Sequence, residues 1–479
     1  MNGVAGKAVA AMRWRAAQLA GVEAIYFLRL LILAKLLAPD AFGLLAIASV
    51  AVSILMRLSD VGMIPALVHR RDATPEQHDA AWTVGLVRAM FVTLALVIAA
   101  PAIAALFDQP DATVIIQALA VRPLIDSAAS IGNARLTRDL RFRELAFINV
   151  PGVIVDTLVA ATSAPSIGVW ALVAGALAGS VTTTSLSYVF APQRPTLRFQ
   201  WAEVAPLVNY GRWVLAMGAM TLAGTLVTQV AVSRMLGATA LGLYFLAVKV
   251  AFLPIDAAGA VVGAVAFPLF SGLREDAEAS RRAFRTLLTG LWLLLLPAYA
   301  LILALAPQFE FALGARWSGT APIIQILSFA AVAGIVGELL TRLLMGQGRV
   351  QGAFAIESLQ TLVVCASIVP CLHLLQVKGA AVAWVLGGAA TLVLSILWLK
   401  RLLPGMLTSA RARFLVAPVV ALAAGLVARV VSVPIGGLGG LIAGGFAGVA
   451  TGALALLAAN AWFGLRLQDF QVILRIRNE

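Results

Sequence analysis

The chain is dominated by apolar segments of about 20 residues or more, which follow one another from end to end with short gaps between them. A helix needs about 20 largely apolar residues to cross the hydrocarbon core of a bilayer. Hydrophobic residues fill 61% of the 479 positions and charged residues only 12%, whereas soluble domains carry about 25% charged residues. The segments are apolar on every side and about twice as long as the alternating strands of a membrane β-barrel. The sequence therefore predicts an all-α integral membrane protein.

We predict fourteen membrane-spanning helices, with both ends of the chain on the same side. The helices are expected at 16–37, 42–63, 81–105, 112–133, 145–163, 166–190, 206–232, 240–268, 283–306, 320–345, 350–371, 377–399, 412–431 and 441–463.

The distribution of lysine and arginine predicts the orientation of these helices. If the N-terminus is cytoplasmic, the inside segments hold 23 of the 35 Lys and Arg residues and the outside loops hold 3. Cytoplasmic loops of membrane proteins are enriched in these residues, so we expect both termini in the cytoplasm. The net charge of +13 does not indicate a nucleic-acid partner, because such a footprint clusters cations on one solvated face.

An internal repeat divides the chain. The stretch AKLLAPDAFGLLAIA (34–48) matches SRMLGATALGLYFLA (233–247) at a constant offset of 199 residues, and RFRELAFI (141–148) is a weaker echo of GRVQGAFAI (348–356). Parallel repeats imply two bundles with the substrate site between them. We predict a six-helix bundle at 1–200, a second at 201–400, and helices 13 and 14 with a cytoplasmic tail at 401–479.

The sequence gives no sign of a catalytic domain or a cofactor. The longest inside loops, around 64–80 and 269–282, are too short for a soluble domain, and neither a Walker motif nor a dinucleotide fingerprint occurs. The three histidines are too dispersed to indicate a metal site. We expect a transporter and not an enzyme, without cofactor or metal, driven by substrate gradients, ion gradients or the membrane potential.

Nine cations fall inside the predicted helices, where each costs about 2.5–3.5 kcal/mol on insertion scales. Five lie near a helix end, from which a long side chain can reach the interface: Lys35, Arg88, Arg212, Arg342 and Arg429. The four deeper ones are Arg29, Arg57, Arg122 and Lys249. Deep cations face a protein interior or a water-filled cavity, and their default interpretation is functional.

Two interpretations of the deep cations remain open. One is structural pairing, of Arg57 with Asp60, Arg122 with Asp126 and Lys249 with Asp256. The other is substrate binding, because a cation-lined cavity suits an anionic substrate and arginine grips phosphate in a fork. Arg29 has no carboxylate within helical reach except Glu23, so we predict that it meets a negatively charged headgroup in the membrane.

Acidic residues also lie inside the predicted helices. They are candidates for proton or sodium coupling, and equally for simple counter-ions; Glu338 is spaced to pair with Arg342 at i,i+4. The acids are Asp60, Asp126, Asp156, Asp256, Glu338 and Glu357.

Two stretches resemble a known family. LLAPDAFGLLAIASVAVSILMRLSDVGMIPALVHRRDATPEQ (36–77) resembles the helix 1–2 region and following loop of the polysaccharide transporter (Wzx-type) flippases, which belong to the multidrug/oligosaccharidyl-lipid/polysaccharide exporter superfamily. NARLTRDLRFRELAF (133–147) resembles the loop between helices 4 and 5 of that family. The predicted helix count and the two-bundle repeat agree with the family over nearly the whole chain.

The resemblance implies a fold, a substrate and partners. The fold is two bundles around a cavity that opens alternately to each side. The substrate is an oligosaccharide on undecaprenyl pyrophosphate, flipped from the cytoplasmic to the outer leaflet of the bacterial inner membrane. The implied partners are membrane lipids and, for polymer assembly, a polysaccharide polymerase and a chain-length regulator. Related peptidoglycan-precursor flippases have cations on helices 1, 2 and 8, where Arg29, Arg57 and Lys249 lie.

Three alternatives stay open at this point. They are a peptidoglycan-precursor (lipid II) flippase, a drug or cation antiporter of the same superfamily, and a membrane enzyme such as a polysaccharide polymerase or ligase. The Asp-Leu-Arg-Phe-Arg run at 139–143 favours polysaccharide export. An excess of deep cations suits a cationic drug poorly, and the longest outside loop, 307–319, is short for an enzyme.

Overall fold

A computed structural model describes residues 2–59, 75–139, 141–193, 195–196, 212–274, 276–403 and 411–463. Every regular element in these ranges is a helix, which confirms the predicted all-α class. The chain forms two compact units, Met1–Gly242 and Leu243–Glu479. The three-part division at 200 and 400 expected from the sequence stays a prediction.

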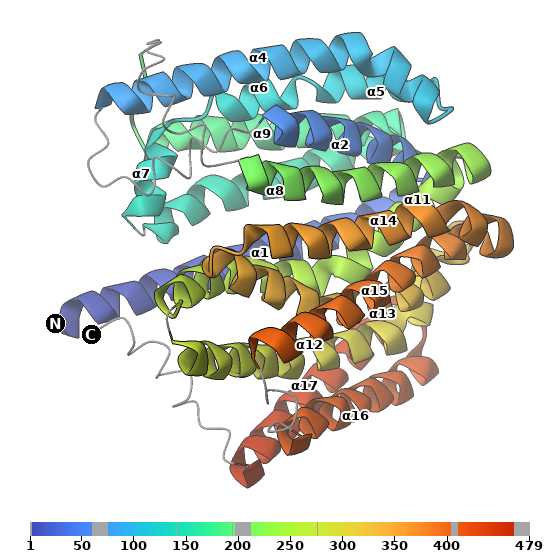
Figure 1. Cartoon of the computed structure of the whole chain (residues 1–479). Coiled ribbons are helices and arrows are strands. Elements are labelled where there is room, and N and C mark those ends of the chain that lie inside the picture. The colour runs from blue at the N-terminus through green and yellow to red at the C-terminus, as the bar shows by residue number, and fades with distance from the viewer. Residues whose placement is uncertain are drawn as a thin grey trace. The chain divides into compact units, whose positions relative to one another are not determined.

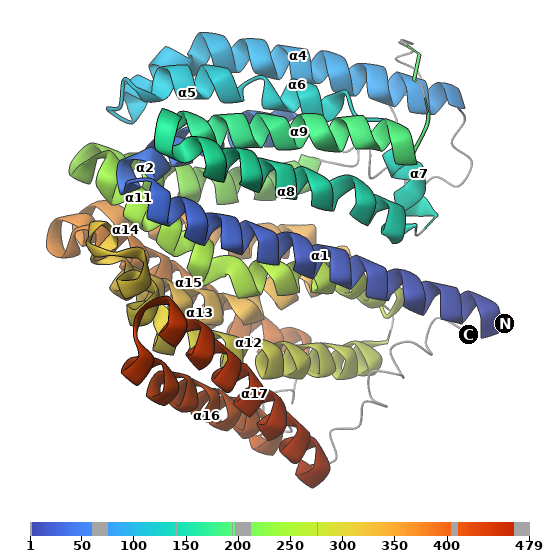
Figure 2. The same ribbon diagram turned by 180° about the vertical axis from the view of Figure 1, so that it is seen from behind.

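The first unit is built from helices of very different lengths. They are α1 (Asn2–Leu36), α2 (Pro39–Ser59), α4 (Pro75–Leu106), α5 (Ala112–Leu119), α6 (Arg122–Ser127), α7 (Gly132–Arg138), α8 (Phe142–Ile167), α9 (Trp170–Phe190) and the first part of α11 (Arg212–Gly272). Helix α8 packs against both α1 and α9, as Figure 2 shows, and α6 packs against α4 and α9.

The second unit holds the rest of α11 together with α12 (Ala277–Leu313), the short 3₁₀ helix η1 (Ala315–Trp317), α13 (Thr320–Gly346), α14 (Val350–Leu375), α15 (Val377–Leu402), α16 (Arg411–Ile435) and α17 (Gly437–Phe463). Helix α12 packs against α13, α16 and α17, and α15 packs against α13 and α14 (Figure 1). Asp276 begins α12 as its N-cap, because its Oδ1 accepts the Ala279 N–H at 2.8 Å.

Membrane spans can be counted among the described residues by length and composition. Eleven helices are long and apolar enough to cross a membrane, or twelve if the bent pair Ala112–Ser127 and Gly132–Arg138 is one span. The predicted number of fourteen is not confirmed by this count. The stretch Gly218–Gly259 takes in parts of the predicted segments 206–232 and 240–268 but counts as one helix. Helix α1, which contains Glu23, Arg29 and Lys35, is not among the eleven.

The repeat found in the sequence is a repeat of structure at two turns. Gly237 has φ 86° and ψ 176°, so α11 breaks there, as the chain breaks between α1 and α2. A Cβ on Gly43 would collide with the carbonyl of Ala238, and one on Gly242 with the carbonyl of Pro39. Each glycine lies 199 residues from the other, as do Pro39 and Ala238. The two turns therefore pack against each other reciprocally, through the same positions.

The weaker echo also corresponds to matching structure. Helices α8 and α14 both have 26 residues. Their N-caps, Arg141 and Arg349, have φ/ψ of −83°/60° and −91°/53°, and their C-caps, Gly168 and Gln376, both have positive φ, 56° and 51°. Each pair is 208 residues apart. The same offset relates small residues of α9 to those of α15: Gly179 to Gly387, Thr183 to Thr391, and Ser187 to Ser395.

The span predicted at 112–133 is not one helix. The chain forms α5, α6 and α7 in its place, with a bend of 63° before α7. Pro123 lies in the first turn of α6, where a missing N–H and a fixed φ are tolerated, although in a helix interior they break the ladder. The segment predicted as one span is therefore a broken span, and apolar length alone does not reveal the break.

Side chains of neighbouring helices satisfy the carbonyls at this break. Broken helices survive at membrane depth only where other groups satisfy the freed backbone atoms. Four carbonyls accept such bonds: Ala120 from Thr93 at 2.7 Å, Ile125 from Thr184 at 2.9 Å, Ala128 from Tyr188 at 2.7 Å and Ala129 from Trp82 at 3.1 Å. The donors come from α4 and α9, so the break is locked between these helices.

Candidate functional site

Glycine brings α8 and α9 into close contact around Asp156. A Cβ on Gly175 would lie 2.6 Å from the backbone oxygen and from Oδ1 of Asp156, and one on Gly179 would lie 2.8 Å from its Cβ. Small residues at such positions let helix backbones approach each other in a membrane. Asp156 is 7% exposed as a result.

Asp156 forms an ion pair with Arg29. The Arg29 Nε and Nη2 atoms lie 3.1 and 3.0 Å from Oδ1 of Asp156, and the two side chains are 15% and 10% exposed. The pair joins α1 to α8. Removing one member of a buried pair leaves an uncompensated charge, so each residue depends on the other for its stability in this place.

A cavity of about 330 Å³ lies next to this pair, within the first unit. Its walls come from α1, α6, α8 and α9. Asp156 lines it, together with polar side chains from all four helices, among them Gln18, Tyr26, Arg122, Asn149 and Thr183. The break between α5 and α6 thus supplies one wall of the cavity.

The other deep cations of the first unit are more exposed than Arg29. Arg122 pairs with Asp126 at 3.5 Å, with side chains 45% and 46% exposed, so the predicted local pairing is confirmed. Arg57 lies in the last turn of α2, with one guanidinium nitrogen 4.0 Å from the position of a Cβ on Gly218. Its predicted partner, Asp60, lies outside the described residues.

In the second unit the predicted residues are spread over three helices. Lys249 on α11 is exposed, with Nζ 5.5 Å from the centroid of the Phe245 ring, a distance at which cation–π attraction acts. Asp256 on the same helix is exposed, and its predicted pairing with Lys249 stays a prediction. Glu357 on α14 is half-buried.

The predicted pairing of Glu338 with Arg342 on α13 is confirmed. The Glu338 Oε1 atom accepts hydrogen bonds from Nε and Nη2 of Arg342 at 3.0 and 2.5 Å. Of the predicted site residues, the structure therefore gathers Arg29, Arg122 and Asp126 around the cavity of the first unit. Lys249, Asp256, Glu338 and Glu357 belong to the second unit.

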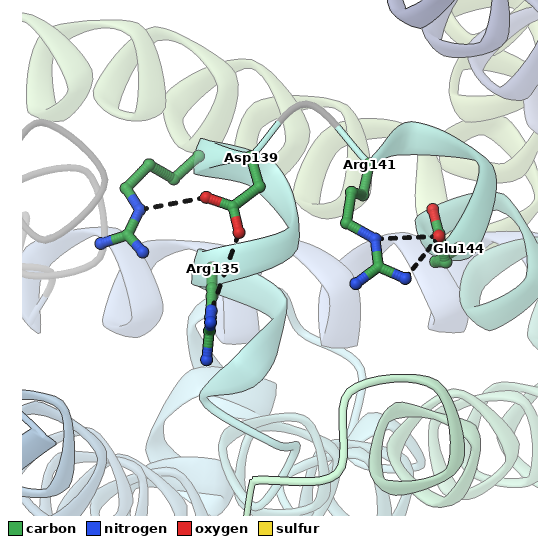
Figure 3. A network of polar contacts seen from close by, with 5 residues as sticks. Arg135, Asp139, Arg141 and Glu144 are labelled. Carbon is green, nitrogen blue, oxygen red and sulfur yellow. Dashed lines mark hydrogen bonds and ion pairs between the residues drawn. The ribbon is translucent and has the colours of Figure 1, made fainter. Parts of the chain in front are cut away.

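Three of the four arginines at 133–147 are tied to carboxylates (Figure 3). Nε and Nη2 of Arg141 donate to Oε1 of Glu144 at 2.9 and 2.7 Å, while Arg135 and Arg138 lie 3.7 and 3.4 Å from the two oxygens of Asp139. The motif singled out in the sequence is thus an ordered network.

Sequence reasoning missed the role of Asp156. It counted Asp156 as a membrane acid but gave it no partner, because Arg29 is 127 residues away and i,i+4 spacing reveals only partners on one helix. One signal could have found it. Arg29 was the deep cation with the least local compensation, and Asp156 lies mid-helix among apolar residues, so each needed a partner on another helix.

The sequence matches known proteins over much of its length. Residues 32–322, more than half of the chain, match a family described as polysaccharide biosynthesis protein. The lipopolysaccharide biosynthesis protein WzxC of Escherichia coli is 24% identical over 76% of this chain and 75% of its own length. The succinoglycan biosynthesis transport protein ExoT of Rhizobium meliloti is 25% identical over 66% of this chain and 65% of its own length.

A solved structure shares the fold. The lipid II flippase MurJ in an inward closed conformation superimposes with a TM-score of 0.70 and covers 92% of this chain and 96% of its own. The two sequences are 13% identical, so this similarity shows a common fold alone.

Proposed function

We propose that this chain, which belongs to the polysaccharide biosynthesis protein family and has many helices able to span a membrane, flips undecaprenyl-pyrophosphate-linked oligosaccharide repeat units from the inner to the outer leaflet of the cytoplasmic membrane. The flipped units would serve the assembly of exopolysaccharide, capsule or the O-antigen of lipopolysaccharide. The observation that carries the proposal is the family match over residues 32–322, which includes most of the walls of the cavity.

The buried ion pair supports a direct role for Arg29 in this transport. An arginine in a low-dielectric site binds a phosphate in a fork with two parallel hydrogen bonds. Oδ1 of Asp156 lies against Nε and Nη2 of Arg29 and orients the guanidinium. A guanidinium has five N–H donors, so the diphosphate of the substrate binds those that Asp156 does not use, and the buried ion pair stays in place during binding.

The remaining expectations from the sequence complete the proposal. Both termini lie in the cytoplasm, and the cations of the inside loops attract the diphosphate to the membrane surface. Arg57, Arg122 and Lys249 assist Arg29 during passage by alternating access. The chain is a transporter and not an enzyme, and it works with a polymerase and a chain-length regulator.

Two other functions are distinguished by the experiment described below: a lipid II flippase and a drug or cation antiporter. A lipid II flippase has the same fold, as the MurJ similarity illustrates, and a drug or cation antiporter belongs to the same superfamily. The matched relatives named for lipopolysaccharide and succinoglycan biosynthesis favour polysaccharide export over both.

The proposal is tested by deleting the gene and measuring two quantities in the same cells. These are the surface polysaccharide and the undecaprenyl-pyrophosphate-linked oligosaccharide on the cytoplasmic face. We expect the polymer to disappear and the inward-facing intermediate to accumulate, with both reversed by the wild-type gene. Normal polymer with a change in sensitivity to cationic drugs would support the antiporter. Accumulation of lipid II would support the peptidoglycan-precursor flippase.

A further inference from the structure

The cavity of the first unit is lined by neutral polar groups as well as by charged ones. Its lining includes amide and hydroxyl groups on three helices: Gln18 and Tyr26 of α1, Asn149 of α8, and Ser180 and Thr183 of α9. Amides and hydroxyls both donate and accept hydrogen bonds. A ligand that presents several groups of the same dual kind is therefore matched from three sides.

The charges around the cavity cancel. Arg122 is paired with Asp126, and Asp156 is paired with Arg29. Two cations and two carboxylates leave the local charge near zero, so the cavity has no surplus of positive charge with which to hold a second diphosphate. Ion pairs in place can still donate to and accept from a neutral polar ligand, because a carboxylate has about four acceptor sites and a guanidinium five donors.

The size of the cavity limits the ligand further. At about 330 Å³ it lies at the low end of the range of roughly 300–1,000 Å³ for small-molecule sites. It is too small for a whole oligosaccharide with its diphosphate. Tyr26 adds a flat apolar body with a polar tip to the wall, which suits a ring that has an apolar face and a polar edge.

We propose that this cavity binds one neutral sugar ring of the oligosaccharide headgroup and so contributes to the choice of glycan. The inference rests on the proposed flippase function and adds to it a division of labour. Arg29 recognises the diphosphate common to all such lipids, whereas the cavity beside it recognises a sugar that differs between them.

The test compares a variant of the cavity lining with a control variant outside it, and each substitution keeps the side-chain volume similar. Asn149→Leu combined with Thr183→Val keeps the size of both side chains but removes their polar groups from the cavity. Thr182→Val is the matched control, because Thr182 adjoins Thr183 outside the lining and its hydroxyl bonds the Ala178 carbonyl of its own helix at 2.8 Å. If the double variant does not insert, Thr183→Val alone takes its place.

Binding is measured by saturation-transfer NMR on the purified full-length chain in nanodiscs. The probes are glucose, galactose, N-acetylglucosamine, glucuronate and inorganic pyrophosphate. We expect at least one neutral sugar to receive saturation from the wild type and from Thr182→Val, and at least tenfold less from the cavity variant. Pyrophosphate should not displace that sugar.

Three results would overturn the inference: no neutral sugar bound by the wild type, equal binding by the cavity variant, or displacement of the sugar by pyrophosphate. The gene deletion described above separates this failure from that of the flippase function. Inward-facing intermediate that accumulates without any sugar binding refutes the sugar site alone. Sugar binding without accumulation refutes the transport step.

Discussion

The hairpin of α8 and α9 and the hairpin of α14 and α15 share one backbone design but differ in what lies between their helices. At an offset of 208 residues Asp156 corresponds to Val364, Gly152 to Gln360 and Ala176 to Trp384. The contact of Gly179 with Asp156 reappears as a contact of Gly387 with Val364, at the same 2.8 Å from an added Cβ.

The difference shows that a few residue changes at matching positions distinguish a hairpin with a site from one without those residues. In the first hairpin small residues leave a cavity and an acid enters the interface, whereas larger residues stand at the matching positions of the second. The partner of Asp156 changes in parallel, because the position 199 residues after Arg29 is Thr228, whose hydroxyl bonds its own helix at 2.8 Å. The two hairpins thus share a backbone design, while the acid and the small residues that line the cavity occur in the first hairpin.

The largest expected effect comes from giving the first hairpin the residue of the second. Asp156→Val should destabilise the folded protein by about 3–5 kcal/mol, because it leaves Arg29 buried without its counter-ion. The loss is measured as a lower midpoint of thermal unfolding of the purified chain in detergent.

The double variant Arg29→Thr with Asp156→Val sharpens this result. Replacing both members of a buried pair with uncharged residues is often neutral or stabilising, so most of the lost stability should return while flipping is abolished. A double variant that exports polymer at the wild-type rate would show that the pair has no part in transport.

An intermediate effect is expected at Gly175, whose counterpart in the second hairpin is Ala383. Gly175→Ala places a methyl group 2.6 Å from the Asp156 backbone oxygen, and overpacking of this kind costs about 1–3 kcal/mol. Gly85→Ala on α4 is the control, since nothing lies within 4 Å of its Cβ position. It should be neutral or stabilise the helix by up to about 1 kcal/mol. Equal unfolding midpoints for the two variants would argue against the close contact of α8 and α9.

The smallest expected effect concerns the broken helix, which in the second unit corresponds to the continuous α13. Tyr188→Phe removes the donor to the Ala128 carbonyl and should cost about 1 kcal/mol. Ser328→Ala on α13 removes a hydroxyl that bonds Ile324 within its own helix, where the carbonyl already has its helical partner. We expect a smaller shift of the unfolding midpoint for Ser328→Ala, and the reverse order would contradict the account of the break.

Much of the fold could be predicted from apolar length and from the repeat, because both are written in local sequence. The pairs Arg122–Asp126 and Glu338–Arg342 were also predictable, since helical spacing fixes which side chains meet. The pair Arg29–Asp156 was not, because it depends on how α1 packs on α8.

The cavity, like the Arg29–Asp156 pair, could not be predicted because it depends on how helices pack against one another. Its volume depends on glycine contacts between α8 and α9 and on a helix break, and apolar length records neither. Pro123 is visible in the sequence, but the side chains that donate to the carbonyls at the break lie on α4 and α9, and only the folded structure brings them there.

The reciprocal contact of Gly43 and Gly242 limits how the two copies of the repeat can change. Gly43 meets the carbonyl of Ala238, and Gly242 meets the carbonyl of Pro39. Pro39 and Ala238 are equivalent positions of the two copies, as are the two glycines, so the contact is made by the same positions from both sides, as in an isologous interface. Neither turn can accept a larger residue at its glycine without a compensating change in the other, so the two copies of the repeat can diverge at these positions only together.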